Sequence, residues 1–299
     1  MKKVFILIIS ILLSNQSILA QDDWMTSWYA AKRLALAQDK MLLMIWDEAM
    51  YFKSPVFITD GEDNDVVIDN LFDSPEINAL LWDNFVLVKV SEAEYPKWYE
   101  ALRKSRSLGY LNKLGDNSIK VMDANGNILN AGYDDDFVLD LIKFLNKYAL
   151  NTSYLKQELI NYRNEKNFYT SFYLASKYID YAFYVNKEVR PEIVDLSNIY
   201  LKEAKNFLAA ENLENKADLI QRIELLEIEQ FLVVNQPKKV LRKLKRIEES
   251  QLQGANNQLY AFLYFVAYRL LLDEENAAVW RPKISLVDLE KAKYIINLR

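Results

Sequence analysis

The sequence contains neither cysteine nor histidine among its 299 residues. Without cysteine, the chain can form no disulfide and perform no thiol chemistry. Without histidine, it lacks the usual general base near neutral pH and the commonest zinc ligand. The two absences exclude Ser-His-Asp and Cys-His mechanisms and a histidine-bound zinc-water. Catalysis would have to use carboxylates, lysine, tyrosine or serine, and the fold must be stabilised by burial of apolar surface.

Glycine and proline are also scarce, with six of each, and no Gly/Ser-rich segment interrupts the chain. This leaves little room for a disordered linker. The length, with 51% hydrophobic and 13% aromatic residues, suits about two domains that follow one another directly. The net charge is −5, and the basic residues form no continuous stripe along the chain, which argues against a nucleic-acid partner.

The first twenty residues have the pattern of a secretory signal peptide. Lys2 and Lys3 precede the apolar run "VFILIISILL", and "SNQSILA" ends in a small residue at Ala20. Cleavage there removes two positive charges, which changes the side-chain charge from −5 to −7. The alternative, an uncleaved membrane helix, needs a longer apolar run to cross about 30 Å of hydrocarbon, and no cysteine is present for acylation. We therefore predict an exported protein, periplasmic or secreted.

Residues 21–150 show apolar patterns of helices and strands in alternation. The patterns predict helices over Trp24–Lys40, Asp73–Phe85, Tyr95–Leu111 and from "DDD" to Leu150, with strands over Met41–Trp46, Phe85–Val90 and a hairpin within Ser118–Tyr133. The continuous apolar run of Met41–Trp46 is typical of a strand buried on both faces. Asn125-Gly126 suits a type I′ turn. This order predicts an α/β domain, with a mixed sheet flanked by helices.

The same order of elements resembles the thioredoxin-like family. The matching segments are "SWYAAKRLALAQDKMLLMIW", "DSPEINALLWDNFVLVKV" and "SIKVMDANGNIL", within about residues 24–150. Members of that family usually carry a Cys-x-x-Cys pair at a helix start after the first of these strands and a cis-proline before the hairpin. Here Met50 and Lys53 stand near the cysteine positions, and Asn117 or its neighbour Ser118 replaces the proline. The resemblance implies a thioredoxin-like domain over 21–150 that has lost its redox residues.

The loop after Met41–Trp46 carries large apolar side chains where the resemblance places an extended bound peptide. The candidate partner-binding residues are Trp46, Met50, Tyr51, Phe52, Lys53 and Pro55, with Asn117 and Ser118 from the turn before the hairpin. Aromatic residues and methionine are favoured at protein interfaces, and large exposed apolar patches usually have a use. We predict that this site binds a protein or an extended peptide. In the alternative, these side chains fill the core beneath the acidic segment that follows.

The acidic segment "TDGEDNDVVIDN" offers oxygen donors of the kind that Ca²⁺ prefers. The donors are Asp60, Glu62, Asp63 and Asp65. Their spacing does not match a twelve-residue calcium loop, so we expect a solvated loop and no metal. Asp47 and Glu48 are adjacent carboxylates that point apart at a strand end, which does not suit a glycosidase pair. We predict no metal site and no cofactor.

Residues 151–299 follow a helical period without a convincing strand, which predicts an all-helical domain. Breaks fall at Asn186–Pro191, Glu211–Asn215, Asn235–Pro237 and Gly254–Asn257. The paired helices resemble a tetratricopeptide-like array, but no clean 34-residue repeat is present, and a plain helical bundle is the alternative.

One predicted helix of this domain, within "PKKVLRKLKRIEES", is strongly basic. Its cations are Lys238, Lys239, Arg242, Lys243, Lys245 and Arg246. They could attach to an anionic membrane surface or to an acidic partner. The simpler alternative is a solvated face, with Val240, Leu241, Leu244 and Ile247 packed inward.

These patterns together predict an exported, redox-inactive protein that acts as a protein-binding or scaffold module of the cell envelope. One alternative is an enzyme that uses carboxylates or Lys53, which predicts a concave site with a strongly shifted pKa. Another is a structural assembly subunit, which predicts a large apolar self-contact.

Overall fold

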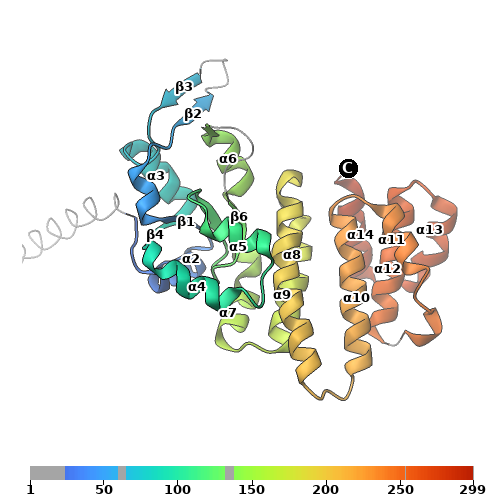
Figure 1. The fold of residues 1–299 in the computed structure, drawn as a ribbon. Helices are drawn as coiled ribbons and strands as arrows, with labels where there is room; N and C mark the ends of the chain where they lie inside the picture. The colour runs from blue at the N-terminus through green and yellow to red at the C-terminus, as the bar shows by residue number, and fades with distance from the viewer. Residues whose placement is uncertain (1–23, 60–64, 132–137, 253, 299) are drawn as a thin grey trace, which may run out of the picture. The chain divides into compact units, whose positions relative to one another are not determined.

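The computed structural model describes residues 24–59, 65–131, 138–252 and 254–298. The chain divides into two compact units, one ending at Lys156 and the other beginning at Gln157. The first unit is mixed α/β and the second is helical (Figure 1). The expected signal peptide, residues 1–20, lies outside the described residues.

Four strands form the main sheet of the first unit, in the order β4-β1-β5-β6 (Figure 1). Strand β1 (Met41–Trp46) pairs in parallel with β4 (Phe85–Val90). On its other side β1 pairs with β5 (Lys120–Met122), which pairs with β6 (Ile128–Ala131), both antiparallel. All residues of β1 are buried. The predicted mixed sheet, and the prediction of a fully buried strand at β1, are confirmed.

Helices cover both faces of this sheet. They are α2 (Trp28–Gln38), α3 (Pro75–Asn84), α4 (Tyr95–Leu102), α5 (Leu108–Gly115) and α6 (Leu141–Tyr148). The rings of Trp46 and Trp28 both contact Trp98 of α4, at 5.4 and 4.9 Å between centroids, so α2 and α4 lie on the face to which Trp46 points. The strand register and the alternation of side chains put Phe85 on the opposite face. There its ring contacts Phe144 of α6 at 5.7 Å.

A short segment before α2 closes the outer edge of β4. Met25 forms a parallel bridge with Val88. Its N–H donates to the carbonyl of Leu87 at 3.0 Å, and its carbonyl accepts from the N–H of Lys89 at 2.9 Å. Trp24 beside it is buried. The expected helix start at Trp24 is therefore wrong. Helix α2 begins at Trp28 after the cap residue Ser27, whose side chain accepts a hydrogen bond from the N–H of Ala30.

The acidic segment is not a plain loop, because part of it forms a second sheet of order β3-β2-β7. Strands β2 (Val56–Thr59) and β3 (Asp65–Ile68) are antiparallel, and β7 (Leu139–Asp140) joins β2 in parallel. The apolar runs "VFIT" and "VVI", separated by a short Gly-containing stretch of sequence, were a usable hairpin signal. The donors expected in the solvated loop, Asp60, Glu62 and Asp63, lie outside the described residues, as does the side chain of Asp65.

The single helix predicted over Tyr95–Leu111 is wrong, since α4 and α5 are separate helices. Ser107 begins α5: its side-chain oxygen accepts a hydrogen bond from the N–H of Tyr110 at 3.2 Å. Serine favours helix caps over helix interiors, because its hydroxyl competes for backbone groups.

The type I′ turn predicted at Asn125-Gly126 is also wrong. Such a turn needs positive φ at both central residues, and of these two only Gly126 has one, at 89°. The carboxylate of Asp123 instead accepts from the N–H groups of Asn125 and Asn127, at 3.0 and 2.9 Å, which stabilises a longer connection between β5 and β6.

All regular elements in the described residues of the second unit are helical. The α-helices are α7 (Lys156–Asn164), α8 (Phe168–Ala182), α9 (Arg190–Ala210), α10 (Lys216–Val233), α11 (Pro237–Leu244), α12 (Ala255–Leu270), α13 (Glu274–Trp280) and α14 (Leu286–Asn297). Helix α8 packs along α9, and α12 contacts α10, α11, α13 and α14. Their lengths range from 7 residues in α13 to 21 in α9, so the helices do not repeat at one length. In the part of the chain that is described, no helix has the length and apolar character needed to cross a membrane.

Candidate functional site

A pocket of about 570 Å³ lies beside the loop that follows β1. Its lining consists of Ile45, Ala49, Phe52, Lys53, Ser54, Phe72, Asp116, Asn117 and Ser118. The volume is within the range of pockets that hold small molecules or side chains. The pocket brings together four of the predicted site residues, which are Phe52, Lys53, Asn117 and Ser118. Two loops that are distant in sequence, one after β1 and one before β5, therefore face a common space.

The first loop is a short 3₁₀ helix, Asp47–Tyr51, followed by an extended segment. One carboxylate oxygen of Asp47 accepts from the N–H of Glu48 at 3.0 Å and from that of Glu92 at 3.1 Å, which ties the loop to the end of β4. At the other end of the loop, the backbone carbonyl of Ser54 accepts a hydrogen bond from the N–H of Leu71 at 2.8 Å. With both ends held by hydrogen bonds, the loop presents the side chains between them from a fixed backbone.

Two aromatic side chains of this loop are exposed. Tyr51 is 87% exposed and Phe52 is 65% exposed, and Phe52 also lines the pocket. Lys53 is exposed as well, whereas Met50 and Pro55 are half-buried. Met50, Tyr51 and Pro55 are not among the residues that line the pocket. The exposed apolar surface predicted for this loop is therefore concentrated on two residues, Tyr51 and Phe52.

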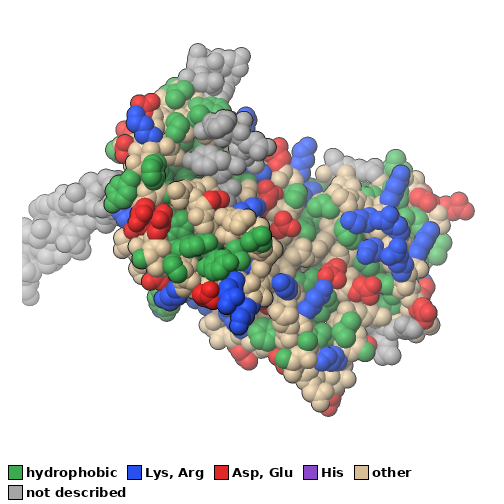
Figure 2. Space-filling model, viewed as in Figure 1, with side chains coloured by type: hydrophobic (Ala, Val, Ile, Leu, Met, Phe, Trp, Pro, Cys, Tyr) green, Lys and Arg blue, Asp and Glu red, His purple; other side chains and the backbone are tan. Residues whose placement is uncertain are grey.

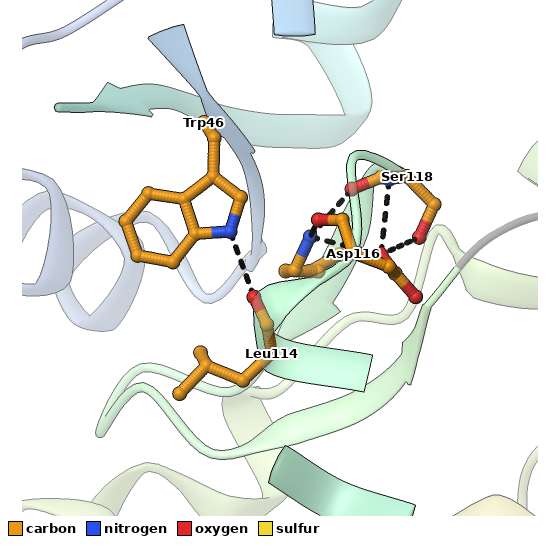
Figure 3. A network of polar contacts seen from close by, with 5 residues as sticks. Trp46, Leu114, Asp116 and Ser118 are labelled. Carbon is orange, nitrogen blue, oxygen red and sulfur yellow. Dashed lines mark hydrogen bonds and ion pairs between the residues drawn. The ribbon is translucent and has the colours of Figure 1, made fainter. Parts of the chain in front are cut away.

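Trp46 belongs to the core, which corrects the prediction that it contacts a partner. Its side chain is 1% exposed. The indole Nε1–H donates to the carbonyl of Leu114 at 2.7 Å (Figure 3), and its ring contacts Tyr95 and Trp98. The polar edge of the ring is thus satisfied inside the protein. Trp46 joins the end of β1 to the end of α5 and so positions both loops of the pocket.

The second loop, Asp116–Ser118, is held by a dense set of hydrogen bonds (Figure 3). The carboxylate of Asp116 accepts from the N–H of Ser118 at 3.0 Å and also from its hydroxyl. The ammonium of Lys120 donates to the carbonyls of Asp116 and Ser118, each at 2.7 Å, and to the Asp116 carboxylate at 3.2 Å. Asn117 is left exposed at the tip of this turn, facing the pocket.

Lys120 is 0% exposed although it carries a charge. Burial lowers the pKa of its ammonium, and the negative charges of Asp116 and Glu92 partly oppose that shift. The sequence holds a signal for this residue that our prediction did not use: a lysine within the short apolar run "SIKVM" has no exposed face to occupy once β5 lies inside the sheet.

Glu92, just after β4, is a second group that the sequence prediction missed. Burial raises the pKa of its carboxyl group, and the neighbouring Glu48 and Asp47 charges raise it further, while Lys120 opposes the shift. Glu48 also hydrogen bonds with Glu92. The adjacent carboxylates Asp47 and Glu48 do not act as a facing pair, because Asp47 bonds to backbone N–H groups and Glu48 turns to Glu92.

The walls of the pocket differ in character. Phe52, Phe72 and Ile45 give it an apolar side, and Asp116–Ser118 give it a polar side with Lys53 at the rim. Such a combination suits a polypeptide side chain next to its own backbone amides. Among the residues that the structure describes, no three carboxylates lie close enough together to hold a metal ion.

No protein-family model, no curated protein and no solved structure matches this chain.

Proposed function

We propose that this chain is a thioredoxin-like protein that has lost its redox residues and binds an extended segment of another protein. We further propose that it is exported to the periplasm or secreted, and serves there as a binding or scaffold module. The observation that carries the proposal is the pocket between the two loops, beside the exposed rings of Tyr51 and Phe52.

The topology of the first unit supports the fold assignment. The resemblance implies a parallel strand pair followed by an antiparallel hairpin, all within one mixed sheet that helices cover on both faces. The order β4-β1-β5-β6 has this arrangement. The turn before β5 has Asn117 and Ser118 in place of the proline, and a hydrogen-bonded Lys120 beneath it holds its shape.

The chemistry of the loop supports binding rather than catalysis by thiols. No cysteine is present to form or attack a disulfide. Full burial of an aromatic or large aliphatic side chain stabilises by about 1.5–3 kcal/mol, so covering the exposed parts of Tyr51 and Phe52 would add about 2–4 kcal/mol to the affinity for a partner. That is enough to change the dissociation constant by about 30- to 1,000-fold.

Site-specific photo-crosslinking tests this proposal. A photoreactive phenylalanine analogue would replace Phe52 in one sample and Leu108, which is 70% exposed on α5 of the same unit, in a control. Crosslinks from position 52 are expected to map by mass spectrometry to one extended segment of a partner, and crosslinks from position 108 are not. The same partner and the same segment from both positions would contradict the proposal.

The affinity for the partner segment then separates binding from folding. The variant Tyr51→Ala/Phe52→Ala should weaken binding at least tenfold, with a melting temperature within about 2 °C of wild type, because both side chains are exposed. The matched control is Tyr29→Ala/Leu108→Ala, which removes two large side chains of the same unit that are also mostly exposed. If the Tyr51→Ala/Phe52→Ala variant unfolds, these side chains contribute to the core and not to a binding site.

A further inference from the structure

Helix α11 and the turn that follows it carry a concentration of positive charge. The cations are Lys238, Lys239, Arg242 and Lys243 on the helix and Lys245 and Arg246 in the turn. No acidic residue lies between Pro237 and Ile247. Figure 2 shows Lys and Arg side chains gathered over the region of α11. We call this group of six cations the α11 basic face.

The backbone of α11 sorts its residues by face. Pro237, Val240 and Leu244 are buried, while Leu241 and Ile247 are half-buried. The four of these positions within α11 lie on one side of a helix with 3.6 residues per turn, and the four cations of the helix take the remaining arc. Lys245, Arg246 and Ile247 follow in the turn after the helix. The prediction that the apolar residues pack inward is confirmed for Val240 and Leu244, whereas Leu241 and Ile247 are only half-buried.

The cations of this face differ from other cations of the second unit in their ion pairing. Elsewhere in the unit, Lys205 pairs with Glu227, and Lys283 pairs with Glu249 at 2.7 Å. Among the ion pairs between described residues, none involves a cation of the α11 basic face. Lys239 instead lies 4.0 Å from the centroid of the Phe231 ring. The six positive charges lie close together and repel one another. Binding to an anionic surface would relieve that repulsion.

The first turn of α11 is hollowed. A pocket of about 640 Å³ is lined by the cations Lys238, Lys239 and Arg242, by the polar residues Asn235 and Gln236, and by the apolar residues Pro237 and Leu271. Three cations and two neutral polar residues around one space suit a phosphate-bearing group.

We propose that the α11 basic face docks on a bilayer rich in anionic phospholipids, with a lipid phosphate in this hollow. Clusters of four to eight Lys and Arg on an amphipathic helix are typical of such attachment. A protein partner fits less well, because four of the six cations are lysines, and lysine is depleted at protein interfaces. The proposal concerns the second unit and does not depend on the peptide site.

Vesicle co-sedimentation tests this proposal with the chain from Gln21 to Arg299. This chain contains all described residues and omits the N-terminal apolar run, which would itself enter vesicles. Vesicles of phosphatidylcholine with about one third phosphatidylglycerol should bind it at low salt and release it at high salt, as electrostatic attachment requires. Vesicles of phosphatidylcholine alone should not bind it.

Charge reversal identifies the face. Lys238→Glu/Arg242→Glu/Lys245→Glu should weaken vesicle binding at least a hundredfold, since each of the three lost cations contributes about a fivefold effect. The control Lys104→Glu/Lys166→Glu/Lys187→Glu makes the same change in net charge at exposed positions away from α11 and should bind as wild type does. The neutral variant Lys238→Gln/Arg242→Gln/Lys245→Gln should lie between the two.

Three results would overturn the proposal. They are equal binding to both kinds of vesicle, equal loss in the test and control variants, and no vesicle binding by a folded wild-type chain. In the last case, salt-sensitive binding to polyglutamate in the same assay would assign the α11 basic face to an acidic polypeptide instead.

Discussion

The buried ammonium of Lys120 gives the sharpest prediction about the first unit. The substitution Lys120→Met keeps the length and approximate volume of the side chain but removes its three hydrogen bonds, to the carbonyls of Asp116 and Ser118 and to the Asp116 carboxylate. The turn that forms one wall of the pocket then loses the group that holds it from below.

The expected cost follows from these contacts. A buried carbonyl left without a donor costs about 1–3 kcal/mol. Two carbonyls lose their donor here, while relief from burying a charge opposes that loss. We expect a net loss of about 2 kcal/mol in the free energy of unfolding of the first unit, and a Tm lower by about 4–8 °C.

The pH dependence of this loss has a defined sign. Burial lowers the pKa of Lys120 in the folded state below its ordinary value of 10.5. Between the folded pKa and 10.5 the unfolded chain therefore binds more protons, so the contribution of Lys120 to stability rises with pH across that window. The advantage of wild type over Lys120→Met must be larger at pH 10 than at pH 7.

Urea unfolding followed by fluorescence, at both pH values, measures this advantage. Lys113→Met serves as the control, because Lys113 is exposed on α5 near the same turn, and we expect it to change stability by less than about 0.5 kcal/mol. A Lys120→Met variant as stable as wild type, or an advantage that shrinks as pH rises, would refute the account of Lys120 as a buried clamp.

Three further predictions concern other contacts. Gly126→Ala should destabilise by about 1–3 kcal/mol in urea unfolding, since φ is +89° there and a new Cβ would lie 2.5 Å from the Trp28 ring. Glu92→Gln should gain stability relative to wild type as pH rises from 4 to 7 in thermal melts, because a raised folded-state pKa means that the wild type loses stability across that window. Lys291→Met should destabilise by about 3 kcal/mol in urea unfolding, because it leaves the buried Glu229 carboxylate without its cation.

Matched substitutions check these three effects. Gly109→Ala has open space around its new Cβ and should be neutral or slightly stabilising. Glu94→Gln is the control for Glu92→Gln, because it makes the same change two residues away. Lys293→Met is the control for Lys291→Met, because it removes an exposed lysine of the same helix, α14. Equal effects in a test variant and its control would show that the named contact is not the cause.

The sequence predicts the parts of the first unit in which apolar pattern alone decides the structure. Strand β1 is an unbroken apolar run and could be recognised without its neighbours. The β2-β3 hairpin is harder, because acidic residues surround its short apolar runs, and composition then favours a loop. The hydrophobic pattern predicts whether a segment is a helix or a strand, but it does not predict which other element will pack against it.

The candidate site shows the same limit. Phe52, Lys53, Asn117 and Ser118 do meet at one pocket. Trp46 does not, because the direction of a ring at a strand end depends on α4 and α5, whose boundary the sequence pattern did not locate.

The bridge between Met25 and Val88 bears on the protection of the sheet edge at β4. A sheet edge with free N–H and C=O groups recruits strands from other molecules, and this is a common origin of aggregates. Here the stretch around Met25 occupies such groups on the outer side of β4, at Leu87 and Lys89. A proteolytic cut between Met25 and α2 would remove none of the helices described above, yet it would free that row of groups. The segment before α2 therefore guards the sheet against edge-to-edge polymerisation.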